Sequence, residues 1–226
     1  GIRGLLFTAT ETDMTFNSMQ KNGLLLAAFA VIATALIIGV QLLTEDKIAR
    51  QQQQQVLRTL NQLIPPALHD NDLYQSCRLL QDPALGITKP QPLYRAWVND
   101  EPTALAAEIV APDGYSGAIR LLLAIQPNGE VLGVRTLRHQ ETPGLGDKIE
   151  IQKSDWIKSF AEKRVRGEDD NRWAVQRDGG MFDQFTGATI TPRAVVSAVK
   201  RATLKLQQQA DVLFNADLPH CQEAQE

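Results

Sequence analysis

A run of small and hydroxylated residues near the end of the chain has the composition of an anion-binding turn. The run Thr186-Gly187-Ala188-Thr189 follows Asp183 and precedes Thr191-Pro192. Thr191 suits the N-cap of a helix over 192–210, and Pro192 suits its first position, where the missing N–H costs nothing. Free N–H groups at a helix N-terminus attract anions, and glycine lets the backbone approach a ligand closely. The pattern predicts a phosphate site, although a small-residue turn that only caps a surface helix has the same composition.

A second stretch, Arg138 to Lys148, concentrates ionisable side chains around a Pro143-Gly144 turn. It follows a predicted hairpin strand, and binding residues often lie on loops held by a rigid scaffold. A polar hairpin exit with a Pro-Gly turn is the alternative interpretation of this stretch taken alone.

Short strands separated by turn signals should position both stretches. The residues Pro127-Asn128-Gly129-Glu130 indicate a hairpin, and Pro112-Asp113-Gly114 indicates a turn. Ser154-Asp155 can cap a short helix whose Trp156, Ile157 and Phe160 face inward. The predicted strands are 93–98, 104–111, 118–126, 131–138 and 172–177. We therefore predict an α+β fold over residues 93–210, an antiparallel sheet with flanking helices on one face.

The N-terminal part contains an apolar run, Leu24 to Leu43, of 20 residues without a charge. As a helix it spans about 30 Å, the thickness of a bilayer's hydrocarbon core. A buried core helix and a cleaved signal peptide are the alternatives, but the run is long for either. We expect an N-terminal segment over 1–22, a transmembrane helix over 23–44, a stalk and lead-in over 45–92, and a C-terminal tail over 211–226. The stalk should be helical up to Pro65-Pro66.

Composition argues against several classes of function. The net charge of −3 and the lack of a dense basic patch give no reason to expect nucleic-acid binding. The three histidines are scattered, and the two cysteines form no CxxC pair, so no metal site is expected. Whether Cys77 and Cys221 pair stays open, because spatial proximity cannot be inferred from their positions in sequence. No P-loop, GxGxxG or nucleophile–base arrangement is present, so no independent catalytic site is expected.

The pattern Asp183-x-x-Thr186-Gly187-Ala188-Thr189 resembles the flavinylation motif of the FMN-binding domain family. The resemblance implies that a flavin transferase joins FMN to Thr189 through a phosphoester, a phosphothreonyl linkage. The segments Tyr115-Ser116-Gly117 and 139–146 precede the motif in the order seen in that family. By this resemblance, the residues around the flavin are His139, Glu141, Thr142, Leu145 and Gly146, together with Asp183, Thr186, Gly187, Ala188 and Thr189 of the motif.

The chain from about Met19 onward resembles the G subunits of Rnf-type (Rsx) electron transport complexes. That resemblance implies a six-subunit complex of the bacterial inner membrane, with the N-terminus in the cytoplasm and the flavin domain in the periplasm. Such a complex moves electrons between NADH and ferredoxin or flavodoxin, coupled to Na⁺ or H⁺ movement. The alternatives are a C-type subunit of a sodium-pumping NADH:quinone reductase, a stand-alone membrane-anchored flavin sensor, and a structural subunit without flavin.

Overall fold

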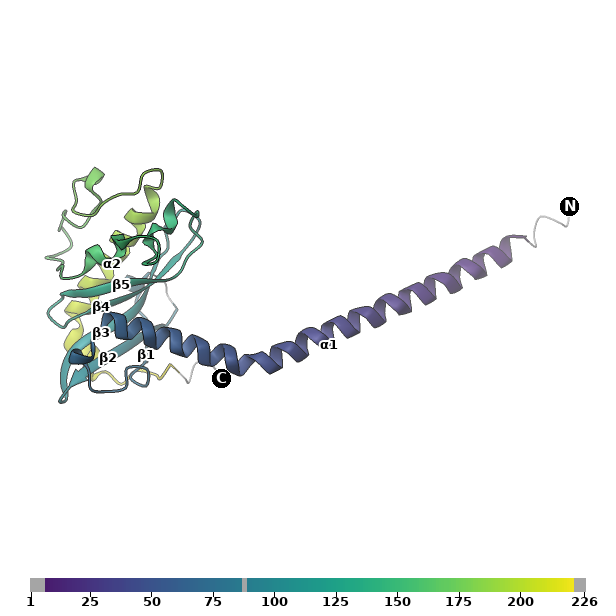
Figure 1. Ribbon diagram of the computed structural model, residues 1–226, viewed down its shortest axis with the longest axis horizontal. Helices are drawn as coiled ribbons and strands as arrows, with labels where there is room; N and C mark the ends of the chain where they lie inside the picture. The colour runs from purple at the N-terminus through teal and green to yellow at the C-terminus, as the bar shows by residue number, and fades with distance from the viewer. Residues whose placement is uncertain (1–6, 87–88, 222–226) are drawn as a thin grey trace. The chain divides into compact units, whose positions relative to one another are not determined.

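The computed structural model describes residues 7–86 and 89–221 (Figure 1). The chain divides into two compact units, Gly1–Gln55 and Val56–Glu226, and each is considered by itself. Helix α1 (Phe7–Leu63) supplies the first unit and the start of the second. The strands are β1 (Arg78–Leu80), β2 (Gln91–Val98), β3 (Glu101–Ala111), β4 (Ile119–Ile125) and β5 (Val131–Arg138), and two helices follow, α2 (Ile190–Gln208) and α3 (Ala210–Asn215).

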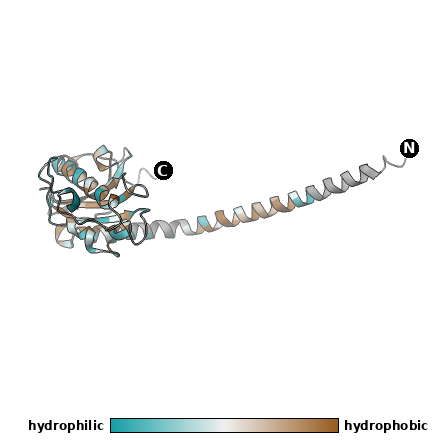
Figure 2. Cartoon of the chain, turned by 90° about the horizontal axis from the view of Figure 1, so that it is seen from above, coloured by the Kyte–Doolittle hydropathy of each residue, from teal (hydrophilic) through white to brown (hydrophobic). Residues whose placement is uncertain are grey.

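The first unit carries one segment, Gln20–Gln41, that is long and apolar enough to cross a membrane. Its 22 residues have no side chain buried against the protein, and Figure 2 shows the apolar stretch along α1. The hydroxyl of Thr34 donates to the carbonyl oxygen of Ala30, 2.8 Å away, so this polar side chain is satisfied within the helix. Such internal pairing is what a hydrocarbon environment requires. The segment overlaps the predicted span 23–44.

The second unit is built on a five-stranded antiparallel meander in the order β1-β2-β3-β4-β5. Four of its strands match predicted ones within a few residues, and the α+β prediction is confirmed. Strand β1 was not predicted, because three residues carry too little alternation to be recognised. The strand expected over 172–177 is wrong. That segment makes one isolated bridge, Val175 to Phe182, and a 3₁₀ turn over Gln176–Asp178.

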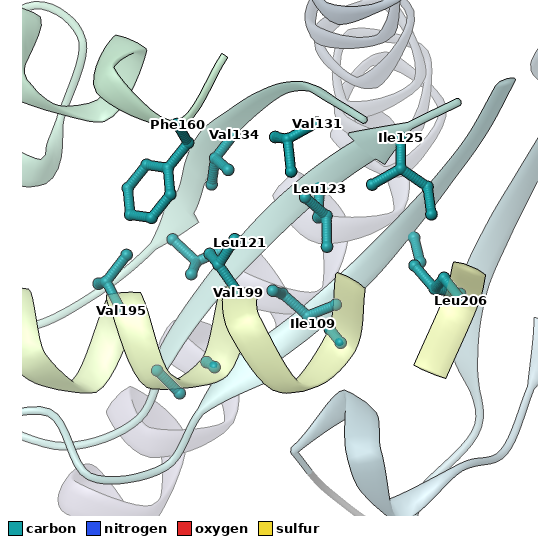
Figure 3. Close-up of a cluster of buried hydrophobic side chains, with 14 of the residues drawn as sticks. Ile109, Leu121, Leu123, Ile125, Val131, Val134, Phe160, Val195, Val199 and Leu206 are labelled. Atoms are coloured by element: carbon teal, nitrogen blue, oxygen red, sulfur yellow. The ribbon is translucent and has the colours of Figure 1, made fainter. Parts of the chain in front are cut away.

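Helix α2 covers one face of the sheet. Alternate residues of β4, Ile119, Leu121, Leu123 and Ile125, join β3 and α2 side chains in the larger core cluster. Figure 3 shows Val195, Val199 and Leu206 of α2 among these strand residues, with Phe160 beside them. Phe160 belongs to η4 (Asp155–Phe160), whose N-cap Ser154 accepts a hydrogen bond from the N–H of Trp156 as predicted. This packing fixes the position of α2 relative to the sheet.

The end of α1 covers the other face of the sheet, so helices flank both faces and not one. Leu60, Leu63 and Ile64 are buried in a second core cluster against Ala104, Ala106 and other small residues. Gly133 of β5 has no side chain because a Cβ there would lie 2.8 Å from Leu63 Cδ2. Full burial of side chains this size contributes about 1.5–3 kcal/mol each. The helix ends at Leu63, before Pro65-Pro66 as predicted.

The C-terminal tail is packed against the edge of the sheet. The guanidinium of Arg95 on β2 donates to the carbonyl oxygens of Phe214 and Ala216 at the end of α3, at 3.0 and 3.2 Å. The N–H of Leu79 donates to Pro219 O at 2.8 Å. Cys77 and Cys221, which the sequence left open, form a disulfide with their Cα atoms 5.6 Å apart. The tail is thereby tied to the segment before β1.

Candidate functional site

A tight turn over Thr142–Leu145 forms one wall of the candidate site. The carbonyl oxygen of Thr142 accepts hydrogen bonds from the N–H groups of Leu145 at 3.1 Å and Gly146 at 3.0 Å. Pro143 and Gly144 occupy the central positions, and Gly144 has a φ of 78°. This is the type II geometry, in which proline presets the first central residue and glycine supplies the positive φ. The Pro-Gly turn predicted from the sequence therefore presents Leu145 toward the site.

A second turn, Phe185–Ala188, faces the first one. The N–H of Ala188 donates to Phe185 O at 3.2 Å, and Gly187 has a φ of 82°. A Cβ added to Gly187 would lie 3.3 Å from Leu145 Cδ2, so the two turns are in close contact. The positive φ favours glycine in the Thr-Gly-Ala-Thr run, and the absence of a Cβ leaves room for Leu145 beside it.

Helix α2 begins directly after this turn, earlier than predicted. Its N-cap is Thr189 and its first residue is Ile190, so the assignment of Thr191 as N-cap is wrong. Thr189 makes no capping hydrogen bond with its side chain and is half-buried. Thr191 lies in the first turn with its side chain fully buried. The Thr189 hydroxyl is therefore not committed to the helix, and it stands where the first N–H groups of α2 lack intrahelical partners.

Glu141 connects three segments at the bottom of the site. Its side chain is 4% exposed; Oε1 accepts from the N–H of Ser116 at 3.0 Å, and Oε2 accepts from the hydroxyl of Thr191. Gly146 packs against this pair, because a Cβ there would lie 2.9 Å from both Glu141 Oε2 and Thr191 Oγ1. No salt bridge reaches Glu141 within residues 7–86 and 89–221. A buried carboxylate held by hydrogen bonds alone fixes the 114–117 turn and α2 to the 141–146 loop.

These segments enclose a pocket of about 320 Å³. Three large apolar side chains are exposed at it: Tyr115 by 66%, Leu145 by 40% and Ile190 by 45%. The remaining lining residues are Glu141, Thr142, Gly146, Gly187, Ala188, Thr189 and Thr191. An apolar rim beside a hydroxyl and a helix N-terminus suits a planar aromatic group that carries a phosphate.

Most of the residues predicted for the site line this pocket, but His139, Asp183 and Thr186 do not. His139 lies behind Glu141, whose N–H donates to His139 Nδ1 at 3.0 Å, and Thr186 is exposed at the tip of its turn. Sequence reasoning missed Tyr115, Ile190 and Thr191 as lining residues. Tyr115 and Ile190 carried a usable signal, since each lies in or beside a segment with a recognisable motif.

Asp183 and its neighbours hold the second turn in place. The carbonyl oxygen of Asp183 accepts from Trp156 Nε1 at 2.8 Å, and its Oδ1 accepts from Gln176 Nε2 at 2.6 Å. Trp156 also meets the Phe185 ring edge-on, with centroids 5.0 Å apart. Nearby, Arg193 of α2 donates two hydrogen bonds to the Asp178 carboxylate, which hold the pKa of that carboxyl below its usual range. Asp183, the acidic residue of the motif, therefore helps to hold the Phe185–Ala188 turn in place.

The comparison with known families agrees with this arrangement. Residues 114–203 match the family model of the FMN-binding domain, and residues 14–63 match that of the RnfG N-terminal region. The first match contains every residue that lines the pocket. The second unit thus contains an FMN-binding domain, and the chain is a flavoprotein.

Similar proteins extend the match to nearly the whole chain. The G subunit of the ion-translocating oxidoreductase complex of Shewanella oneidensis is 55% identical over 89% of this chain and 96% of its own length. The G subunits of Vibrio atlanticus and Vibrio cholerae are 52% and 50% identical over similar shares, 88% and 89% of this chain and 95% and 97% of their own lengths. The chain belongs to the family of Rnf complex G subunits. It is a membrane-anchored electron carrier within an ion-translocating oxidoreductase complex, with other subunits as partners.

Proposed function

We propose that FMN is joined to this chain by a phosphoester at Thr189 Oγ1. The observation that carries the proposal is the position of Thr189, at the start of α2 and in the pocket wall with no capping bond on its side chain. A flavin transferase supplies the FMN group from an activated donor. The Thr189 oxygen forms the new P–O bond, the donor's leaving group departs from phosphorus, and the hydroxyl proton is lost.

The residues around Thr189 suit the two ends of such a cofactor. The unpaired N–H groups and positive dipole end of α2 favour a phosphate at its first turn. The apolar side chains of Tyr115, Leu145 and Ile190 offer contact surface to a flat ring system. When bound, FMN accepts two electrons and can pass them on singly, which is chemistry that no side chain here supplies. The protein's contribution is to bind the group, orient it and set its electrostatic surroundings.

The domain that contains this pocket belongs on the periplasmic side of a bacterial inner membrane, with the N-terminal segment 1–22 in the cytoplasm and the span 23–44 between them. The Cys77–Cys221 disulfide supports this placement, because disulfides persist in oxidising compartments and are rare in the cytosol. A covalent bond also suits a carrier in a compartment where lost FMN is not readily replaced. In this account the chain is one flavin station of a six-subunit complex. It relays electrons between NADH and ferredoxin or flavodoxin while Na⁺ or H⁺ crosses the membrane.

Covalent attachment is tested by co-expressing the full chain with a flavin transferase and recording flavin fluorescence on a denaturing gel. Wild type and Thr186→Ala should both fluoresce at the position of the protein, and Thr189→Ala should be dark. Thr186→Ala is the matched control, because it removes a hydroxyl from the same turn at an exposed position. Fluorescence retained in Thr189→Ala would overturn the assignment. A dark wild type would favour a structural subunit without covalent flavin.

A further inference from the structure

His139 lies outside the pocket lining but is bonded to the loop that forms the pocket. Its side chain is 12% exposed. The N–H of Glu141 points at Nδ1 from 3.0 Å, and Glu150 Oε1 lies 2.8 Å from Nε2. A backbone N–H can only donate, so Nδ1 accepts and carries no proton. Nε2 then carries the ring proton and donates it to the Glu150 carboxylate, which defines a single neutral tautomer.

The bond at Nδ1 acts on the residue that holds the pocket together. Glu141 joins the N–H of Ser116 to the hydroxyl of Thr191, and Gly146 leaves no spare room around that contact. A shift in the Glu141 backbone would therefore be transmitted to the 114–117 turn and to the first turn of α2. Both of these segments contribute to the pocket wall.

We propose that His139 is a positioning residue of the flavin pocket, whose neutral ring holds Glu141 in place and releases it when the ring is protonated. The effect on the flavin rests on the proposed function, because it requires FMN in the pocket. The hydrogen bonds of His139 do not depend on a bound cofactor. An imidazolium has donors at both nitrogens, so it cannot accept from the Glu141 N–H. Protonation would keep the Glu150 contact as an ion pair and break only the Glu141 contact.

The 138–153 segment carries several charged groups on both sides of His139 in the chain. Glu150 faces Nε2, the backbone N–H of Glu141 faces Nδ1, and Arg138 precedes His139 in the chain. The 3₁₀ turn η3 (Gly146–Ile149) adds Asp147 and Lys148, and Asp147 Oδ2 lies 3.8 Å from Lys153 Nζ. Asp147 itself is linked to Glu150 through the Glu150 N–H, which donates to Asp147 O at 2.9 Å. Glu150 is the only one of these groups in direct side-chain contact with the ring among the interactions of the described residues.

Two substitutions separate the two bonds of the ring. Asparagine places an oxygen near the position of Nδ1, where it can accept from the N–H two residues later as in an Asx turn, and this oxygen does not titrate near neutral pH. Glutamine reaches toward the position of Nε2 and retains a donor for Glu150. His139→Asn therefore keeps the Glu141 bond at every pH, and His139→Gln loses it at every pH.

The test uses the full chain in detergent micelles between pH 5 and pH 8, where imidazole changes charge. In wild type, ¹⁵N imidazole spectra should show the Nε2–H tautomer of His139 at pH 8. Exchange of the Glu141 amide, corrected for intrinsic rate, should be about 2- to 10-fold faster at pH 5, the range expected for losing one hydrogen bond. His139→Asn should stay slow, His139→Gln should be fast throughout, and the visible circular dichroism of the flavin should change with pH in wild type only.

An Nδ1–H tautomer at pH 8, or the same pH response in His139→Asn as in wild type, would overturn the proposal. The tautomer and exchange measurements are repeated on Thr189→Ala, which has no flavin acceptor. If Thr189→Ala shows the predicted tautomer and exchange rates while wild type shows no flavin signal, the flavin assignment has failed. The positioning role of His139 would then still stand.

Discussion

The Cys77–Cys221 disulfide gives a stability prediction whose size follows from the chain. The bond closes a loop with a sequence separation of 144 residues. In the chain-entropy description, a cross-link over such a loop removes about 17 cal/mol/K from the unfolded state, or about 5 kcal/mol at 25 °C. Measured effects often fall below this ceiling, because the reduced unfolded chain retains some structure. We expect reduction to lower the free energy of unfolding by about 2–5 kcal/mol.

Urea unfolding of the full chain in detergent, followed by tryptophan fluorescence, measures this loss. All three tryptophans, Trp97, Trp156 and Trp173, lie in the unit that contains the disulfide. Cys221→Ser is the matched variant, since Cys221 is half-buried and Cys77 is buried. Without reductant, Cys221→Ser should have the same free energy of unfolding as reduced wild type. Adding dithiothreitol should not change the free energy of unfolding of this variant. A wild-type stability unchanged by reduction, or an equal response in Cys221→Ser, would refute the reasoning.

Three further substitutions test the packing around the pocket and the native ion pairs. Gly146→Ala should abolish flavin attachment, measured by in-gel fluorescence, because its Cβ would lie 2.9 Å from Glu141 Oε2; Gly167→Ala, with nothing within 4 Å, is the control that should retain it. Thr191→Val should lower the free energy of unfolding in urea by about 1.5–3 kcal/mol, since a buried carboxylate loses a donor, and Thr191→Ser should recover most of the loss. The hydrogen bond from the Arg172 guanidinium is the main cause of the lowered pKa of Asp170. Asp170 therefore stabilises the fold at pH values above the pKa of its carboxyl in the unfolded chain, and this contribution is lost as the pH falls. The stability gap between wild type and Asp170→Asn, about 1–3 kcal/mol at pH 7, should therefore shrink below pH 4; a gap independent of pH would contradict the Asp170 assignment.

Local signals in the sequence were sufficient to predict the structure where particular residue types determine the backbone geometry. Proline followed by glycine specified the turn at Gly144, and the turn Pro127-Asn128-Gly129-Glu130 specified the hairpin of β4 and β5. They were insufficient where the outcome depends on distant partners. Thr191 is a residue type that often caps helices, but its hydroxyl donates to the buried carboxylate of Glu141, 50 residues away in sequence. The helix therefore begins earlier, at Ile190.

The same limit explains why the role of the histidine and the second sheet face were not anticipated. The motif order predicted His139 near the flavin, whereas the structure shows that its Nδ1 accepts a hydrogen bond from the N–H of Glu141. The stripe of Leu60, Leu63 and Ile64 predicted a helix, but not that small residues on the sheet would make room for it. Pairing of cysteines 144 residues apart likewise depends on how the tail folds back, which Arg95 helps to fix.

The central claim is that Thr189 carries FMN, and mass spectrometry of the full chain co-expressed with a flavin transferase tests it most directly. The intact mass should exceed the unmodified one by one FMN less one water, and fragmentation should place the whole increment on Thr189. An unmodified intact chain, or an increment on Thr186 or any other residue, would contradict the account.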